Sequence, residues 1–195
     1  ARAAFERGLD LSPGWWQLDE HLAQISLLEG DVDGALAAYE ALVDRAPSPE
    51  LMDAIAAIHR DEGRTAEMLA WRDRARAAHE ARLALFPEAA AGHAVDHWLE
   101  LEDEPERLVA LAETNRDARP GGEAQTKLAM AYLRAERASD ALEIVTRLAE
   151  TPWSTPETHA VGAIVLELAG DAAGAERHRV LAEALAPGAM ARAAW

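Results

Sequence analysis

The sequence predicts an all-α fold made of antiparallel helix pairs stacked one on the next. Three observations predict it: prolines recur at a nearly constant interval, apolar residues recur between them at helical spacing, and the pattern GDxxGA occurs at 30–35 and again at 170–175. Proline lacks a backbone donor and clashes with the preceding turn, so it marks the ends of helices. One helix pair cannot bury both of its apolar faces, and successive pairs must therefore stack.

The proline interval defines the repeating unit. Six prolines follow one another at intervals of 34, 40, 33, 32 and 35 residues: Pro13, Pro47, Pro87, Pro120, Pro152 and Pro187. Between the first two, the apolar residues of 18–25 and of 35–42 have the spacing of helix faces, with Gly30 between them. Glycine favours a helix C-terminus and a tight turn. Each unit is therefore predicted to be two helices joined by a short turn.

These features resemble the tetratricopeptide repeat (TPR), a motif of about 34 residues with a glycine turn, an alanine and an aromatic residue on the second helix, and a closing proline. Residues 16–49 match it at Leu22, Ala23, Gly30, Ala35, Tyr39 and Pro47. Residues 122–153 match at Leu128, Ala129, Tyr132, Ala141, Leu142 and Pro152, and residues 156–189 at Ala163, Gly170, Ala175, Ala182 and Pro187. Glu136 stands where glycine is usual. The resemblance implies a right-handed α-α superhelix, or solenoid, of about five repeats plus an N-terminal half repeat.

We expect a single repeat domain over residues 1–195. Its parts are a half repeat at 1–14, repeats at 16–49, 50–87, 88–120, 122–153 and 156–189, and a tail at 190–195. Residues 64–86 contain no helix breaker, which predicts a long second helix in the repeat 50–87. The repeat 88–120 diverges most, and Pro105 suits the first position of its second helix. The half repeat leaves an apolar end uncovered, so we expect further repeats before Ala1 or self-association there.

Composition and charge exclude several classes of function. The chain has 19 basic and 35 acidic residues, a net charge of −16, which argues against binding nucleic acid. It has no cysteine and no apolar run long enough to insert into a membrane. No serine lies in GxSxG and no phosphate-binding loop is present, so we expect no enzymatic activity and no cofactor. One lysine against 18 arginines is typical of a GC-rich bacterial genome. The compartment is left open, between a bacterial cytoplasm and a periplasm.

The resemblance also implies a concave groove, lined by the first helix of each repeat, that binds a protein or peptide. The predicted lining residues are Gln17, Glu20, Gln24, Asp53, Arg60, Asp96, Thr126, Met130 and Ile164. The first part of this groove is acidic and the last part apolar, so we expect a scaffold or recruitment module whose partner offers basic or apolar groups. Family members that grip an acidic C-terminus use Lys, Arg and Asn at these positions. Glu20, Gln24 and Asp53 stand there instead, so such a clamp is not expected.

Two other function classes stay open. His93 and His97, at i and i+4, share one helix face and could ligate one metal ion, which would make the chain a metal- or small-ligand-binding protein. The segment HAVDH lacks the glutamate of HExxH, however, and histidines packed between repeats explain the pair as well. The chain could also be an accessory segment of a larger enzyme. Trp153, in the loop 151–156, either packs over a repeat junction or offers an anchor to a partner.

Overall fold

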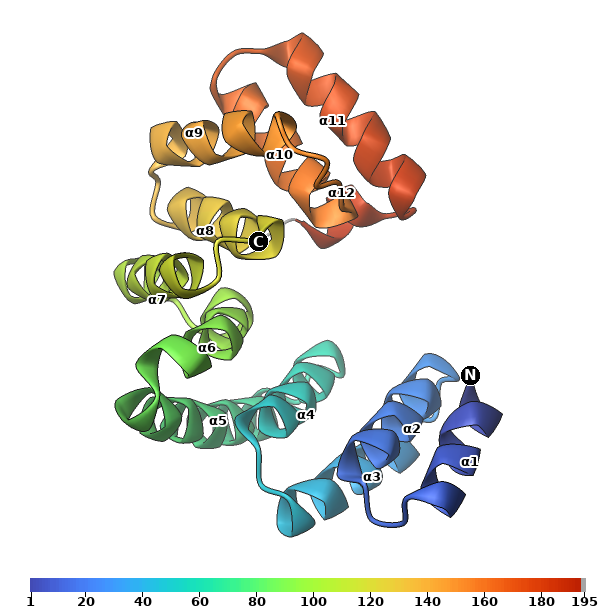
Figure 1. Ribbon diagram of the computed structural model, residues 1–195. Coiled ribbons are helices and arrows are strands. Elements are labelled where there is room, and N and C mark those ends of the chain that lie inside the picture. Colours follow the sequence, from blue (N-terminus) through green and yellow to red (C-terminus); the bar gives the residue numbers. More distant parts are fainter. Residues whose placement is uncertain (194–195) are drawn as a thin grey trace. The chain divides into compact units, whose positions relative to one another are not determined.

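The computed structural model describes residues 1–193, and every regular element in that range is a helix (Figure 1). The helices pair into five hairpins, preceded by one single helix and followed by a short one. The chain divides into two compact units, which we call unit 1 (Ala1–Arg82) and unit 2 (from Leu83 onward). Among the described helices, none is both long and apolar enough to cross a bilayer. The expectation of an all-α repeat fold is confirmed.

Unit 1 contains the first helices of the chain. They are α1 (Arg2–Leu11), α2 (Trp16–Leu28), α3 (Val32–Arg45), α4 (Pro49–Asp61) and α5 (Thr65–Leu85), whose last residues pass into unit 2. The long helix predicted within 64–86 is thus present as one helix of 21 residues, Thr65–Leu85. The core of unit 1 gathers apolar side chains of α2, α3, α4 and α5 around Leu51 and Ile55, which are fully buried. Helix α1 packs on α2 but has no buried residue.

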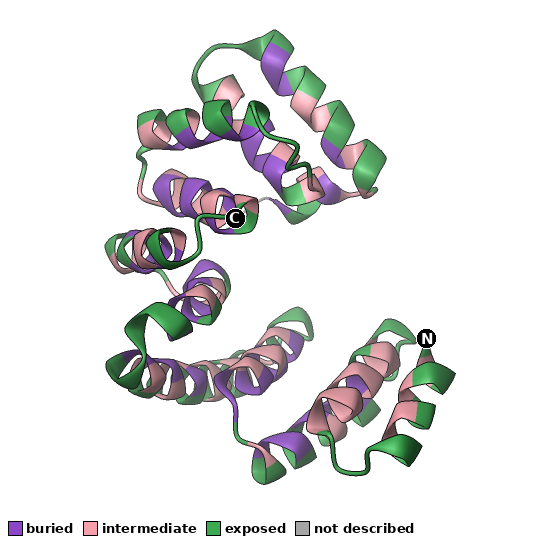
Figure 2. Cartoon of the chain, viewed as in Figure 1, coloured by how far each residue is buried: buried purple, intermediate pink, exposed green. Residues whose placement is uncertain are grey.

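Unit 2 contains the remaining helices. They are α6 (Pro87–Leu101), α7 (Pro105–Ala118), α8 (Gly122–Arg134), α9 (Ala138–Ala149), α10 (Pro156–Leu168), α11 (Ala172–Leu185) and α12 (Ala189–Arg192). Helix α8 contacts both α6 and α10, so the first helices of successive hairpins lie side by side. Buried residues lie on the facing sides of these helices (Figure 2). Trp98 is the largest of them and is 1% exposed. Helix α12 forms part of the expected tail 190–195, whose last two residues lie outside the described range.

Prolines set the starts of four helices. Pro49, Pro87, Pro105 and Pro156 each occupy the first residue of a helix. The backbone N–H at that position has no partner inside a helix, so proline loses nothing there. The hydroxyls of Ser48 and Thr155 cap two of these helices.

Four of the five hairpin turns have one backbone geometry. The left-handed residue of each turn has a positive φ: 87° at Gly30, 70° at Gly63, 57° at Glu136 and 83° at Gly170. The next N–H then donates to a carbonyl five residues back, at 2.8–2.9 Å: Asp31 to Ser26, Arg64 to His59, Arg137 to Tyr132 and Asp171 to Leu166. This is the Schellman motif, and it favours glycine at the left-handed position. Glu136 therefore occupies a left-handed position that this turn usually gives to glycine.

The turns at Glu136 and Gly170 are equivalent, and we expect substitutions at these two positions to change the free energy of unfolding in opposite directions. A side chain in the left-handed conformation costs about 1–2 kcal/mol, offset by about 0.4–1 kcal/mol because glycine makes the unfolded chain more flexible. Glu136→Gly is therefore expected to raise the free energy of unfolding, and Gly170→Ala to lower it, by about 1 kcal/mol each in urea denaturation. Because no atom lies within 4 Å of a Cβ built at Gly170, the second change tests the backbone alone. Equal and same-sign effects would contradict this account.

The repeated GDxxGA pattern has a local explanation in the structure. After the glycine of the turn, Asp31 and Asp171 accept hydrogen bonds from the N–H groups of Gly34 and Gly174, at 3.0 and 2.8 Å. These bonds cap α3 and α11. A Cβ at either of the capped glycines would lie 2.2 Å from an aspartate oxygen. The alanine that follows is buried in both repeats. In the GDxxGA pattern, the first glycine therefore forms the turn and the aspartate caps the helix. The second glycine allows the close approach of the aspartate, and the alanine packs in the core.

The turn between α6 and α7 is different. Glu102 is extended, with φ −120° and ψ 154°, and no left-handed residue ends α6. The guanidinium of Arg134, on the neighbouring α8, instead donates to the carbonyl groups of Leu99 and Glu102, at 3.1 and 3.2 Å. A cation from the next repeat thus caps the end of α6. This explains how the most divergent repeat forms a hairpin without the glycine turn.

Candidate partner-binding site

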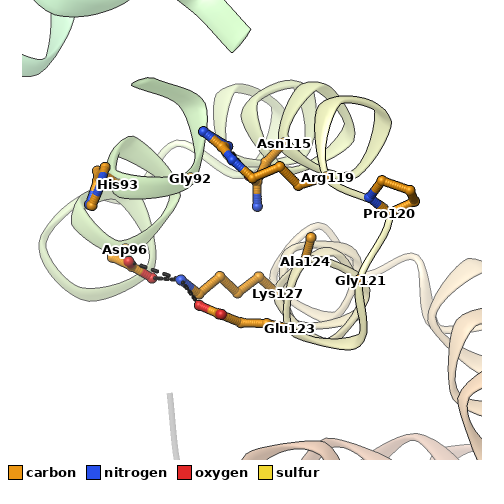
Figure 3. Close-up of a pocket in the computed structure, with 10 residues that line it drawn as sticks. All are labelled: Gly92, His93, Asp96, Asn115, Arg119, Pro120, Gly121, Glu123, Ala124 and Lys127. Carbon is orange, nitrogen blue, oxygen red and sulfur yellow. Dashed lines mark hydrogen bonds and ion pairs between the residues drawn. The ribbon is translucent and has the colours of Figure 1, made fainter. Parts of the chain in front are cut away.

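A pocket of about 440 Å³ opens in unit 2 between α6, the end of α7 and the start of α8 (Figure 3). Helix α6 contributes Gly92, His93 and Asp96; α7 and the following loop contribute Asn115, Arg119, Pro120 and Gly121; and α8 contributes Glu123, Ala124 and Lys127. We call this the α6–α8 pocket. Its lining is polar and contains charges of both signs. It includes Asp96, one of the residues predicted to line the groove.

Lys127 is the centre of charge in the α6–α8 pocket. Its Nζ lies 2.7 Å from Asp96 Oδ1 and 2.9 Å from Glu123 Oε1 (Figure 3). The three side chains differ in their access to solvent: 20% of Lys127 is exposed, against 48% of Asp96 and 72% of Glu123. The ammonium group is therefore shielded while the two carboxylates face outward. Lys127 therefore holds the two carboxylates in place on this side of the pocket.

The pKa values of this group follow from the contacts. Burial alone lowers the pKa of Lys127, but the hydrogen bonds and charges of Asp96 and Glu123 outweigh it, and the net shift is upward. The hydrogen bond and charge of Lys127 lower the pKa of Glu123. At neutral pH, Lys127 and Glu123 are therefore both charged. The ion pair between them is a fixed feature at that pH.

The other side of the pocket is built around Arg119. Its guanidinium donates to the carbonyl group of Ala89 at 2.7 Å and to Asn115 Oδ1 at 2.9 Å, which ties the end of α7 to the start of α6. Gly92 permits this approach, since a Cβ there would lie 2.9 Å from Asn115 Oδ1. Arg119 is thus committed to the backbone of α6. Arg119 is exposed, but its guanidinium is engaged by these carbonyl and amide oxygens.

The other residues predicted for the groove in unit 2 have packing roles. Thr126 is buried rather than presented on a surface. Its hydroxyl lies 2.7 Å from that of Thr158 on α10 and donates to the carbonyl group of Gly122. Met130 and Ile164 are half-buried and pack against the apolar clusters of unit 2. Thr126 therefore joins two repeats and is not accessible to a partner.

Trp153 packs over a repeat junction. Its indole N–H donates to Thr158 Oγ1 at 3.0 Å. Its ring lies over Gly122 at the start of α8, where a Cβ would come within 2.2 Å of the ring. A fraction of 38% of Trp153 stays exposed. Of the two roles predicted for this residue, the structure shows the packing role.

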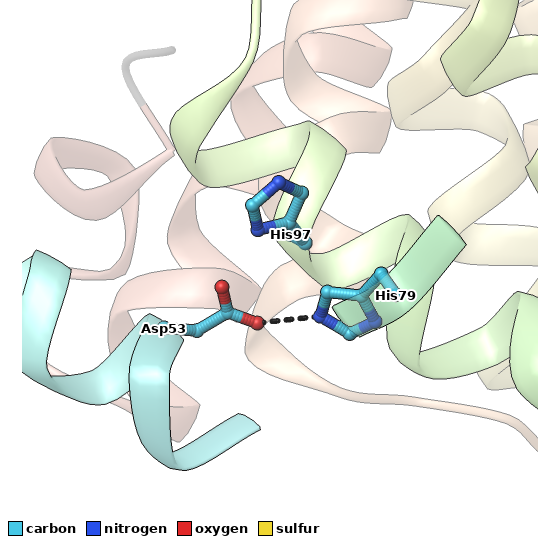
Figure 4. A group of neighbouring side chains, drawn as sticks. All are labelled: Asp53, His79 and His97. Carbon is cyan, nitrogen blue, oxygen red and sulfur yellow. Dashed lines mark hydrogen bonds and ion pairs between the residues drawn. The ribbon is translucent and has the colours of Figure 1, made fainter. Parts of the chain in front are cut away.

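The predicted groove residues of unit 1 lie on α2 and α4. Gln17, Glu20 and Gln24 are on α2, and Asp53 and Arg60 are on α4. Asp53 Oδ2 lies 2.8 Å from Nε2 of His79, a fully buried side chain of α5 (Figure 4). Arg60 is exposed and contacts the neighbouring Asp61.

A second carboxylate joins α4 and α5 in the same way. Glu50 accepts hydrogen bonds from Ser48 and from Arg82 of α5. Burial raises the pKa of Glu20. The charge of His21 lowers that pKa and the negative charge of Glu50 raises it, with a net upward shift. Glu50 and Asp53, two acidic residues of α4, therefore both join α4 to α5.

The two histidines considered for a metal site have different environments. His93 is exposed at the edge of the α6–α8 pocket. His97 is 1% exposed, and its Nε2 lies 3.3 Å from Glu102 Oε1. In the described part of the chain, no group of three or more His, Asp and Glu side chains at metal-ligand spacing includes His93. Although the two histidines are only four residues apart on α6, His97 lies in the core and His93 lies in solvent.

Comparison with known proteins gives a result for the fold. No protein-family model matches the sequence, and no curated protein does. A TPR protein from Thermus thermophilus is similar in structure with a TM-score of 0.62 and 16% identity, over 92% of this chain and 97% of the other. PilW, a type IV pilus biogenesis factor, is similar with a TM-score of 0.61 and 14% identity, over 89% of this chain and 78% of the other. MamA from Desulfovibrio magneticus RS-1 is similar with a TM-score of 0.54 and 17% identity, over 87% of this chain and 94% of the other. The chain therefore has a TPR-like fold.

Proposed function

We propose that this chain is a non-catalytic scaffold that binds a basic segment of a partner protein at the α6–α8 pocket. The observation that carries the proposal is the outward-facing pair of carboxylates, Asp96 and Glu123, held by Lys127. Asp96 lies on α6 and Glu123 on α8, so helices rather than loops present these side chains, and stacked-repeat folds use extended surfaces for binding.

The geometry of the pair suits a guanidinium or ammonium group. Lys127 Nζ contacts both oxygens of Asp96, at 2.7 and 3.0 Å, and one oxygen of Glu123, at 2.9 Å. A carboxylate offers about four lone-pair sites, and 48% of Asp96 and 72% of Glu123 stay exposed. An incoming cation can therefore reach the carboxylates without displacing Lys127. Because Lys127 already restricts both side chains, binding costs less conformational entropy than it would for two free carboxylates. Charge-assisted hydrogen bonds of this kind are also stronger than neutral ones.

The charge of the whole chain supports the same kind of partner. A net charge of −16 attracts a basic segment over a distance and raises its rate of association. Glu20 and Asp53 of unit 1 have the same sign. Met130, which is half-buried on α8 beyond Lys127, offers an adaptable apolar contact to residues that flank the basic group. The partner is therefore proposed to combine basic and apolar residues.

A peptide-display selection tests this proposal. Selection on the unmodified protein is expected to enrich peptides with Arg or Lys next to apolar residues. Binding of an enriched synthetic peptide should be about tenfold or more weaker to the Asp96→Asn/Glu123→Gln double variant, because two charge-assisted contacts are lost. The salt dependence of binding should also become shallower. Fluorescence anisotropy at two ionic strengths measures both effects.

A matched control is Asp103→Asn. Asp103 is an acidic residue of unit 2 that is 99% exposed and does not line the pocket. This variant changes the net charge by one unit and is expected to leave the affinity within about twofold, as is usual for an exposed charge away from a binding site. Enrichment of acidic peptides, or equal affinity of the double variant and the unmodified protein, would refute the proposal.

A further inference from the structure

A pair of histidines joins the two helices of the last hairpin in unit 2. His159 lies on α10 and His178 on α11, and their Nδ1 atoms are 3.3 Å apart. The rings are inclined at 64°, with centroids 5.0 Å apart. Two nitrogens bound to one tetrahedral ion at about 2.0–2.1 Å lie about 3.3–3.4 Å from each other. The observed separation fits an N–H···N hydrogen bond between the two rings and also matches that of two ligands of a single metal ion.

The geometry points to a binding site for a divalent transition-metal ion, Zn²⁺, Ni²⁺ or Cu²⁺, formed by the Nδ1 atoms of His159 and His178. Imidazole is a favoured ligand for these three ions. Within the described residues, no third His, Asp or Glu joins this pair at ligand spacing. Water would fill the other positions. The site is therefore open and exchangeable, unlike a structural zinc site with four protein ligands.

The surroundings of His159 suit this role. Coordination through Nδ1 requires the proton on Nε2, and a ligating histidine usually donates that proton to an oxygen. Ser154 Oγ lies 2.8 Å from His159 Nε2, where it can accept the proton and hold the ring. Ser154 is exposed, in the loop before α10. This serine is a positioning residue for the site.

A glycine makes room for the second ligand. Gly162 lies one turn after His159 on α10 and is buried. A Cβ at this position would come within 2.2 Å of His178 Nδ1. Any other residue at 162 would therefore displace the imidazole from its place opposite His159. Gly162 thus keeps the two nitrogens facing each other.

The pKa values of both histidines lie below the ordinary value of histidine. Burial lowers the pKa of His159. Burial is the largest cause that lowers the pKa of His178, followed by the charges of His159 and Arg177, and a hydrogen bond to the backbone of His159 acts in the opposite direction. The charge of Arg177 also opposes a bound cation, which favours a site of exchangeable rather than very tight binding.

Calorimetric titration of the full chain with Zn²⁺ tests the site. We expect one ion bound per chain, loss of this saturable binding in His159→Gln and in His178→Gln, and about tenfold or greater weakening in Ser154→Ala. Electron paramagnetic resonance of bound Cu²⁺ should show coupling to two nitrogens. Far-UV circular dichroism checks that each variant keeps its helices. Because Ser154 is exposed, its variant tests the site even if a histidine variant unfolds.

His93→Gln is the matched control, since His93 is an exposed histidine of the same unit outside this hairpin. Its Zn²⁺ binding should equal that of the unmodified protein. Absence of saturable binding to the unmodified protein would overturn the inference. So would unchanged binding in a folded His159→Gln variant, or loss of binding in His93→Gln, which would move the ligand to the α6 pair considered from the sequence.

Discussion

Replacing Trp98 with alanine is expected to lower the free energy of unfolding by about 3–5 kcal/mol. Trp98 is 1% exposed and lies in the main apolar cluster of unit 2, with residues of α6, α7, α8, α9 and α10. Its removal deletes the largest buried side chain of that cluster and leaves a cavity that rigid helices fill only partly. Urea denaturation followed by far-UV circular dichroism measures the change, and hydrogen exchange should show lost protection in α6, α7 and α8.

Trp15→Ala provides the control for this experiment. Trp15 precedes α2 in unit 1 and is 53% exposed. Alanine there removes the same number of atoms from a site that is mostly in solvent, so the free energy of unfolding should change far less than for Trp98. If the two variants shift the urea midpoint equally, Trp98 is not a central packing residue of unit 2.

Asp53→Ala is expected to lower the free energy of unfolding by about 1–3 kcal/mol. Asp53 Oδ2 is 2.8 Å from Nε2 of His79, whose side chain is fully buried, and alanine removes this polar partner. Asp61→Ala, on the same helix but with 70% of its side chain exposed, should change the stability by less than about 0.5 kcal/mol. Thermal and urea denaturation of both variants provide the comparison.

This experiment also separates two roles of Asp53. The sequence placed it in a partner-binding groove, whereas the structure shows it bonded to α5. A loss of stability similar to that of Asp61→Ala would contradict the structural role. In that case, weaker binding of the basic peptide by Asp53→Ala would assign the residue to partner recognition instead.

The fold could be predicted from the sequence because its signals are local. Proline acts on its own turn, so Pro105 and Pro156 mark helix starts without any knowledge of their neighbours. The repeat register also identified Glu136 as the residue in a glycine position. The structure gives it a φ of 57°, the conformation that the register requires. Local rules of this kind need only a short stretch of chain.

The site was harder to predict because its contacts join separate repeats. Lys127 was recognised only as the single lysine, since its partner Asp96 lies one repeat earlier in the chain. The repeat period was itself the missing signal: Thr126 and Thr158, 32 residues apart, also meet on neighbouring first helices. Pairing each first-helix residue with the one about 32 positions later would have brought Lys127 and Asp96 together.

The histidines show the same distinction. Residues four apart on a helix differ by about 40° in direction, which is enough to bury His97 and expose His93. His159 and His178, in contrast, lie on opposite sides of the turn at Gly170, at similar distances from it along the chain. Antiparallel helices bring such positions together. Symmetry about a hairpin turn is therefore a better guide to histidine pairs here than spacing along one helix.

The contact between Gly122 and Trp153 restricts which substitutions these two positions can accept independently. While the tryptophan ring is present, even a single methyl group at position 122 collides with it. A descendant of this chain could accept a larger residue at 122 only by losing or moving the ring. Once the ring is lost, selection for glycine at 122 is relaxed. The two positions should therefore change together among descendants, although they are distant in the chain.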